Sequence, residues 1–275
     1  MSDWDPELYL RFEAERTRPA RELLARINHP QAMQVSDLGC GPGNSTALLA
    51  QAWPTAQVTG VDNSLNMLNK AQERLPQCTF VQSDISHWQP DEAQDVIYAN
   101  AALQWVLDHE TLLPHLVAQL ADNGVLAIQM PDNLNQPSHA LMRKVAAEGP
   151  WESLNGEAES VRKKLLTTEE YYDLLALQGC EVDIWRTTYY HVMPSASAII
   201  DWLSSTGLRP FLDKLSEEQR PEFLRRYLFE LEKIYTPRAD GRCYWHSLAY
   251  LLWRVMWRKE RFSDAEFCSR CYSLF

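Results

Sequence analysis

The most informative segment of the chain runs Val35-Ser36-Asp37-Leu38-Gly39-Cys40-Gly41-Pro42-Gly43-Asn44, and it holds three of the ten glycines in 275 residues. A short apolar run ends at an acidic residue, the glycines follow, and a helix-compatible segment comes next. Glycines at such a position let the backbone turn sharply and approach a ligand closely. The segment therefore predicts a strand–turn–helix unit with a ligand beside the turn.

The glycine spacing favours a nucleoside ligand over a pyrophosphate. The pattern is GxGxG, and Asn44 occupies the place of the third glycine of the dinucleotide fingerprint. Pro42 removes one backbone donor from the turn, and Asp37 adds a negative charge beside it. A cationic or zwitterionic nucleoside suits this loop best, although a nicotinamide enzyme with a similar sheet stays open as an alternative.

Strands and helices are expected to alternate on both sides of this loop. This order predicts an α/β fold with a doubly wound, mostly parallel sheet, because short strands joined by helices form right-handed βαβ units. The carboxyl ends of such strands meet at one edge, where ligands bind. The expected strands are 34–38, 57–61, 79–82, 95–98 and 125–129, and the helices are 44–53, 64–75 and 111–120, with Ser64 as a helix cap.

Four segments follow from this pattern. Residues 1–28 predict a helical lid, with Pro19 in a first helical turn, and residues 29–130 form the ligand-binding core. Residues 131–241 are expected to form a helical insertion and substrate-side cap, and residues 242–275 an atypical tail. Within the insertion, helices are expected at 139–147, 168–177, 195–204 and 216–235, with a return strand at 181–191.

Acidic residues recur at successive strand ends. Asp62 lies 25 residues after Asp37, and Asp84 lies 22 residues after Asp62. A carboxylate at Asp62 can accept hydrogen bonds from both ribose hydroxyls, and one at Asp84 can accept from an adenine amino group. Met67 and Ile85 could sandwich the ring. The alternative is that these are ordinary exposed residues at strand ends.

Composition excludes several classes of protein. The formal net charge is −11, so a general nucleic-acid binder is not expected. No run approaches 18 apolar residues, the acidic N-terminal segment is unlike a signal peptide, and the cysteines form no convincing metal cluster. We expect a monomeric cytoplasmic protein with no metal and no membrane or nucleic-acid partner.

Residues 35–130 resemble the class I S-adenosylmethionine-dependent methyltransferases. Further segments are similar to the trans-aconitate methyltransferases within that class, namely residues 4–12, 15–20, 37–46, 99–105, 129–133, 179–191 and 206–210. The similarity extends from the start of the chain to about residue 241. It implies a Rossmann-like methyltransferase that transfers a methyl group from S-adenosylmethionine to a carboxylate of trans-aconitate, a small-molecule tricarboxylate.

The resemblance also implies roles for individual residues. The methionine part of the cofactor is expected against Asp37, Gly39, Gly41, Gly43 and Asn44. Asp62 would hold the ribose and Asp84 the adenine side, with Met67 and Ile85 against the ring. Asn63 is a further cofactor-binding candidate. Asn100, at the end of the fourth strand, would lie close to the sulfonium.

The chemistry requires orientation more than proton transfer. A carboxylate with a pKa of about 4 is already ionised at neutral pH, so we expect no general base and no metal. A trianion needs cationic clamps, for which arginine is best suited. We rank Arg209 first, with Arg11 and Arg18 next, among arginines in distinctive settings that also include Arg16, Arg143 and Arg186. Tyr9, Trp105 and Tyr190 could form the pocket wall. Solvated surface residues are the plain alternative for this set.

The last 34 residues depart from the family pattern. Residues 242–275 carry six Lys+Arg against three Asp+Glu, with three of the six Cys and three of the ten Trp. A lost base near Arg242 would shift the reading frame and replace the apolar strand with which the family closes its sheet. The alternative is a natural basic, aromatic helix that serves as an interaction tail. With such a tail, sheet closure and activity are in doubt, so one alternative is a catalytically impaired methyltransferase-like protein. A separate alternative is a methyltransferase for another small polycarboxylate.

Overall fold

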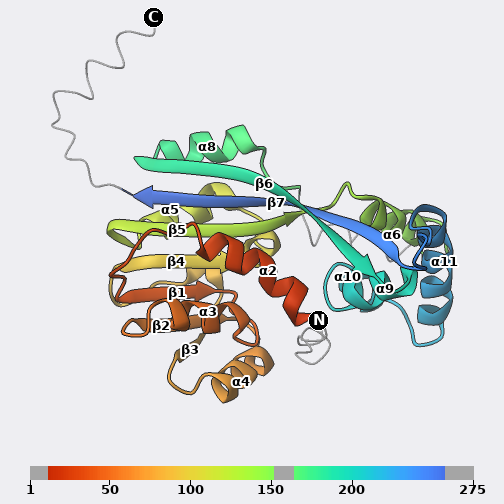
Figure 1. The fold of residues 1–275 in the computed structure, drawn as a ribbon, viewed down its shortest axis with the longest axis horizontal. Helices are drawn as coiled ribbons and strands as arrows, with labels where there is room; N and C mark the ends of the chain where they lie inside the picture. Colours follow the sequence, from red (N-terminus) through yellow and green to blue (C-terminus); the bar gives the residue numbers. More distant parts are fainter. Residues whose placement is uncertain (1–11, 152–163, 258–275) are drawn as a thin grey trace, which may run out of the picture.

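The computed structural model describes residues 12–151 and 164–257. A seven-stranded sheet with the order β3-β2-β1-β4-β5-β7-β6 forms its centre (Figure 1). The first five strands in this order are parallel, and β7 is antiparallel to both of its neighbours. The predicted doubly wound, mostly parallel sheet is therefore confirmed. The strands are β1 (Gln34–Leu38), β2 (Gln57–Asp62), β3 (Thr79–Gln82), β4 (Gln94–Asn100), β5 (Leu120–Asp132), β6 (Cys180–Met193) and β7 (Cys243–Trp257).

Helices cover both faces of the sheet because alternate strand residues point to opposite sides. In β4, Val96 and Tyr98 pack on the side of α2 and α3, whereas Ile97 and Ala99 pack with α5 and α8. The helices of the sheet are α2 (Glu13–Leu24), α3 (Asn44–Ala52), α4 (Leu65–Arg74), α5 (His109–Val117) and α8 (Thr168–Ala176), with short 3-10 turns η1 (Ile85–His87) and η2 (Leu103–Trp105).

Of the local sequence signals at helix starts, one was confirmed and one was wrong. Ser64 caps α4, as predicted, because its hydroxyl accepts a hydrogen bond from the backbone of Met67. The expectation for Pro19 was wrong, since α2 already begins at Glu13 and Pro19 lies buried inside it. Strand β5 begins at Leu120, before the expected start at residue 125, and in this added part Asn123 has a positive φ. The pairing of β4 with β5 also shifts register between Gln94 and Val96.

A second group of helices lies beyond the end of the sheet toward which β5 points (Figure 1). It consists of α6 (Pro137–Ala147), α9 (Ala196–Ser204), α10 (Arg209–Leu212) and α11 (Gln219–Ile234). Their buried side chains share one core with Trp151 and with the adjoining ends of β6 and β7. We call these four helices the helical cap.

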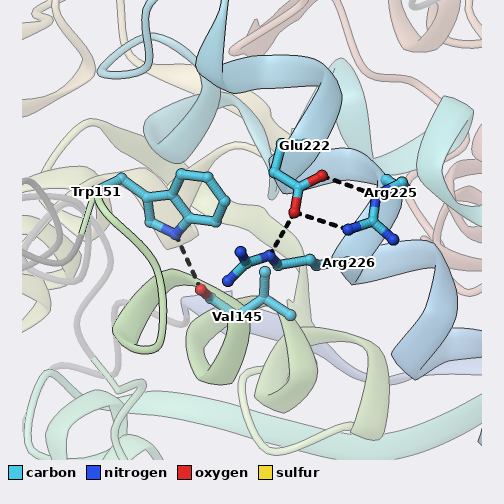
Figure 2. A network of polar contacts seen from close by, with 5 residues as sticks. All are labelled: Val145, Trp151, Glu222, Arg225 and Arg226. Atoms are coloured by element: carbon cyan, nitrogen blue, oxygen red, sulfur yellow. Dashed lines mark hydrogen bonds and ion pairs between the residues drawn. The ribbon is translucent and has the colours of Figure 1, made fainter.

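Polar contacts on the cap lie beside Trp151 (Figure 2). Glu222 accepts hydrogen bonds from Arg225 and Arg226, and the Arg226 guanidinium lies over the Trp151 ring at 5.4 Å. The indole of Trp151 donates to the backbone oxygen of Val145 in α6. These contacts connect α11 to α6 around a fully buried tryptophan.

The first part of the atypical tail completes the sheet. Residues 243–257 form β7, which pairs with β5 on one side and β6 on the other. The expectation that this tail puts sheet closure in doubt was wrong, and so was the alternative of a helix over this part. The physical reason is that β5 and β6 do not pair with each other, so β7 satisfies the backbone groups of both strands. Residues 258–275, with Cys268 and Cys271, lie outside the described residues.

Candidate active site

The glycine loop is fixed to the neighbouring strand by its backbone. The amides of Gly39 and Cys40 both donate to the carbonyl of Val61, at 2.7 and 3.0 Å. Gly39, Gly41 and Gly43 all have positive φ, which disfavours any residue with a side chain. A Cβ on Gly39 would come within 2.3 Å of the Cβ of Ala102. The loop therefore needs glycine both for its conformation and for its close approach to the segment after β4.

Asp62 joins this loop to the start of the next helix. One carboxylate oxygen accepts from the amide of Gly41 at 2.9 Å, and the other accepts from the amide of Ser64 at 2.9 Å. These bonds orient the carboxylate at the carboxyl end of β2, where it lines the main cavity. An anionic acceptor is thus held rigidly at the edge where a ligand is expected.

Asp37 has a different position from the one expected. It is fully buried and accepts hydrogen bonds from the hydroxyls of Ser45 and Thr46 in α3, at 2.7 and 2.6 Å. Burial raises the pKa of its carboxyl to about 6, and the two hydroxyl bonds oppose this shift. Asp37 holds the first turn of α3 under the loop and does not line the cavity described next.

The main cavity opens at the carboxyl ends of β1, β2, β3 and β4. Its volume is about 570 Å³, within the usual range for small-molecule sites. Nine residues predicted from the sequence line it: Gly39, Gly41, Asp62, Asn63, Met67, Asp84, Ile85, Asn100 and Trp105. Asp84 is oriented by the amide of Ser86, from which it accepts at 2.8 Å.

Other predicted residues lie outside this cavity. Gly43 caps the start of α3, and the side-chain amide of Asn44 donates to the carboxylate of Glu13 in α2 at 3.0 Å. Arg18 pairs with Glu22 on the exposed face of α2, and Tyr190 is largely exposed on β6. Arg209 pairs with Asp213 at 3.8 Å within the cap. Tyr9 and Arg11 lie outside the described residues.

Some cavity residues were missed in the sequence. They follow the ends of β3 and β4, form the segment between β4 and α5, or lie in the first part of α5. The signal that could have identified them is adjacency to Gln82 and Asn100, the last residues of β3 and β4. Pro42 also lines the cavity and belongs to the predicted glycine loop. The missed residues are Ser83, Ser86, His87, Ala101, Ala102, Val106, Leu107, Asp108, Thr111 and Leu112.

Known proteins identify the family. A model described as a methyltransferase domain matches residues 35–124. The trans-aconitate 2-methyltransferase of Yersinia pestis is 57% identical over 242 residues, which cover 88% of this chain and 94% of the relative. The enzyme of the same name from Klebsiella pneumoniae is also 57% identical, over 88% of this chain and 93% of that relative. The chain belongs to the trans-aconitate 2-methyltransferase family. The expected class I S-adenosylmethionine-dependent methyltransferase is therefore confirmed.

Solved structures of other proteins agree with this fold. Phosphoethanolamine N-methyltransferase 2 of Haemonchus contortus, in complex with S-adenosyl-L-methionine, has a TM-score of 0.58 at 16% identity, covering 92% of this chain and 57% of that one. The YcgJ protein of Bacillus subtilis has a TM-score of 0.56 at 14% identity, covering 88% and 100%. At these identities the likeness concerns the fold alone.

The described residues hold neither a membrane-spanning helix nor a metal-binding cluster. None of their helices has the length and apolar character needed to cross a membrane. Within the same residues, no group of three or more His, Cys, Asp and Glu side chains could hold a metal ion.

The cavity of this family member fits the expected nucleoside. A Cβ on Gly41 would meet no protein atom within 4 Å, so the loop leaves open space at the cavity wall. Asp62 and Asp84 supply oriented acceptors, while Met67 and Ile85 supply apolar surface. The Oδ1 atom of Asn100 is buried in the wall and has no hydrogen-bond partner in the described part of the chain. Such an atom is costly unless a ligand or water supplies a donor.

Proposed function

We propose that this enzyme transfers a methyl group from S-adenosylmethionine to a carboxylate of trans-aconitate, giving the monomethyl ester and S-adenosylhomocysteine. Two observations together support it most. The chain is 57% identical to a trans-aconitate 2-methyltransferase, and its cavity holds a carboxylate, Asp62, that is already oriented to accept hydrogen bonds from a ligand. The proposed substrate carries three carboxylates, and the proposed donor carries a sulfonium.

The site residues have separate roles in this proposal. Asp62 and Asn63 hold the ribose hydroxyls, Asp84 accepts from the adenine amino group, and Met67 and Ile85 pack against the ring. Gly39 and Gly41 allow the close approach of the amino-acid part, and Asn100 lies near the sulfur. When bound, S-adenosylmethionine supplies an electrophilic methyl group.

The protein needs to align the reactants and exclude water from them. The acceptor carboxylate is ionised at neutral pH, with a pKa of about 4, so no side chain has to remove a proton. Water stabilises a separated anion and cation, and their charges cancel during in-line transfer. A closed site therefore lowers the barrier. Helix α2 packs on one face of the sheet, and the helical cap lies beyond the end toward which β5 points, so we expect the closure to come from these elements (Figure 1).

Substrate choice is tested with a panel of acids. The purified full chain is assayed with S-adenosylmethionine and trans-aconitate, cis-aconitate, citrate or an unsaturated dicarboxylate, and the monoester is quantified by mass spectrometry. The proposal requires the highest kcat/KM for trans-aconitate. A higher value for another acid would make this chain a methyltransferase for that polycarboxylate. No ester from any acid, with cofactor bound, would show the catalytically impaired alternative.

Three expectations belong to the same proposal. The enzyme acts as a monomer, in the cytoplasm, and on a free small molecule without a nucleic-acid partner. The roles of Arg209, Arg18, Arg11, Tyr9 and Tyr190 toward the substrate stay predictions.

A further inference from the structure

A small recess adjoins the main cavity beneath the glycine loop. Helix α2 contributes Arg16, Thr17 and Ala20 to it, and the loop, α3 and Asn100 form the rest. Gly39, Gly41, Pro42 and Asn100 line both spaces, so the recess and the main cavity meet at the loop. Arg16 therefore lies in the wall of a space that directly adjoins the main cavity at the loop.

The side chain of Arg16 is buried and fixed in orientation. The residue is only 9% exposed. Its Nη2 atom donates to the carbonyl of Trp202 at 3.0 Å and to the hydroxyl of Ser205 at 2.8 Å, and the guanidinium lies 4.9 Å from the centre of the Trp202 ring. Contacts from the cap thus hold a planar cation at the recess. A guanidinium is the side chain best suited to a carboxylate, which it can bind through two parallel hydrogen bonds.

Charge around the crevice makes this cation important. Asp62, Asp84 and Asp108 line the main cavity, and Arg16 is the one lysine or arginine that lines either space in the described part of the chain. Both reactants of the proposed function carry carboxylates, which these acidic residues would repel. Arg16 is placed to compensate for that repulsion at the loop.

We propose that Arg16 is a carboxylate-binding residue of the active site, and this inference rests on the proposed function. The carboxylate can come from the amino-acid part of the cofactor or from the acid substrate. The recess favours the first source, because the unpartnered Oδ1 of Asn100 lines it as well and would accept from an ammonium group. A guanidinium and a carbonyl oxygen together complement a zwitterion.

The experiment compares Arg16→Lys and Arg16→Met with Arg21→Lys, which changes an exposed arginine of the same helix. Calorimetry measures the affinity for S-adenosylhomocysteine and for 5′-methylthioadenosine, which is a similar nucleoside without the amino-acid part. The KM for trans-aconitate is measured at saturating S-adenosylmethionine. Ser205→Ala keeps the charge and removes one bond that orients it, and thermal unfolding confirms that each variant is folded.

We expect Arg16→Met to bind S-adenosylhomocysteine roughly 10- to 100-fold more weakly while its affinity for 5′-methylthioadenosine is unchanged. A similar rise in the KM for trans-aconitate alone would support the clamp and assign the carboxylate to the substrate. Unchanged affinity and KM in a folded variant would overturn the proposal, as would equal losses for both nucleosides. The nucleoside comparison needs no turnover, so it stays informative if trans-aconitate proves not to be the substrate.

Discussion

The carboxylate of Asp62 accepts a hydrogen bond from the backbone amide of Gly41 across 2.9 Å. The residue at the end of β2 therefore fixes the middle of the glycine loop as well as facing the cavity. The Asp62 side chain therefore both holds the shape of the loop and serves as the proposed acceptor for the ribose hydroxyls.

Replacing Asp62 with alanine should weaken cofactor binding by about 1–3 kcal/mol, because it removes an acceptor and leaves two backbone amides without it. Asp62→Asn keeps one carbonyl acceptor and should lose less. Titration calorimetry with S-adenosylhomocysteine measures both variants. Equal affinity in the wild type and in Asp62→Ala would remove Asp62 from the binding site.

Replacing two loop glycines with alanine, one at a time, should separate an effect on stability from an effect on cofactor binding. In Gly39→Ala the new Cβ would approach the Cβ of Ala102 within 2.3 Å at a positive φ, so the loop must shift and stability should fall by about 1–3 kcal/mol. In Gly41→Ala the Cβ meets no protein atom, so stability should fall by only about 1 kcal/mol while cofactor affinity drops. Chemical denaturation and calorimetry distinguish the two effects. A Gly39→Ala protein as stable as the wild type would show that Ala102 does not limit the space beside Gly39.

Stability should depend on the protonation of His191. Burial against Trp202 and Trp245 lowers the pKa of this imidazole to about 4, from an ordinary value of 6.5. The unfolded chain takes up the proton near pH 6.5 and the folded chain only near pH 4. The free energy of unfolding contributed by His191 therefore falls as the pH is lowered through this window, by up to about 3 kcal/mol.

The control for this prediction is His191→Phe, which keeps an aromatic ring without a titrating group. Burial raises the pKa of Asp37 to about 6, so protonation of this carboxyl increases the free energy of unfolding as the pH falls below 6. Asp37 is present in both proteins, so its effect is the same in each. Denaturation curves at pH 7, 5.5 and 4.5 should show a smaller acid-induced loss in the variant. Parallel pH profiles would mean that His191 is not held neutral by burial.

Strand β7 should be required for the fold. A chain that stops at Arg242 would leave β5 and β6 without their shared neighbour, and exposed strand edges of this length promote aggregation. A chain that stops at residue 257 keeps the whole strand and serves as the matched comparison. The shorter chain should show no cooperative thermal transition, whereas the longer one should. Equal transitions would contradict the central position of β7.

Sequence patterns located the parallel half of the sheet well because its strands are short apolar runs punctuated by polar ends. The expected strand 34–38 matches β1, and Asp62 and Asp84 line the cavity since parallel strands end at one edge. The same reasoning could not foresee that Asp37 turns inward, because this depends on the hydroxyls of Ser45 and Thr46 in the packed helix.

Contacts between distant segments were beyond the sequence patterns. Arg16 reaches its place through bonds to Trp202 and Ser205, which lie more than 180 residues away in the chain. The basic, aromatic tail was expected as a helix in one alternative, whereas its first part forms β7 because β5 and β6 share it as a common partner.

Direct binding of the methyl donor tests the central claim. Calorimetric titration of the full chain with S-adenosylmethionine, and separately with NAD, asks which nucleoside the crevice accepts. We expect saturable one-to-one binding of S-adenosylmethionine, weakened in Asp62→Ala, and no heat of binding with NAD. Binding of NAD in place of S-adenosylmethionine, or no uptake of S-adenosylmethionine at millimolar concentration, would contradict it.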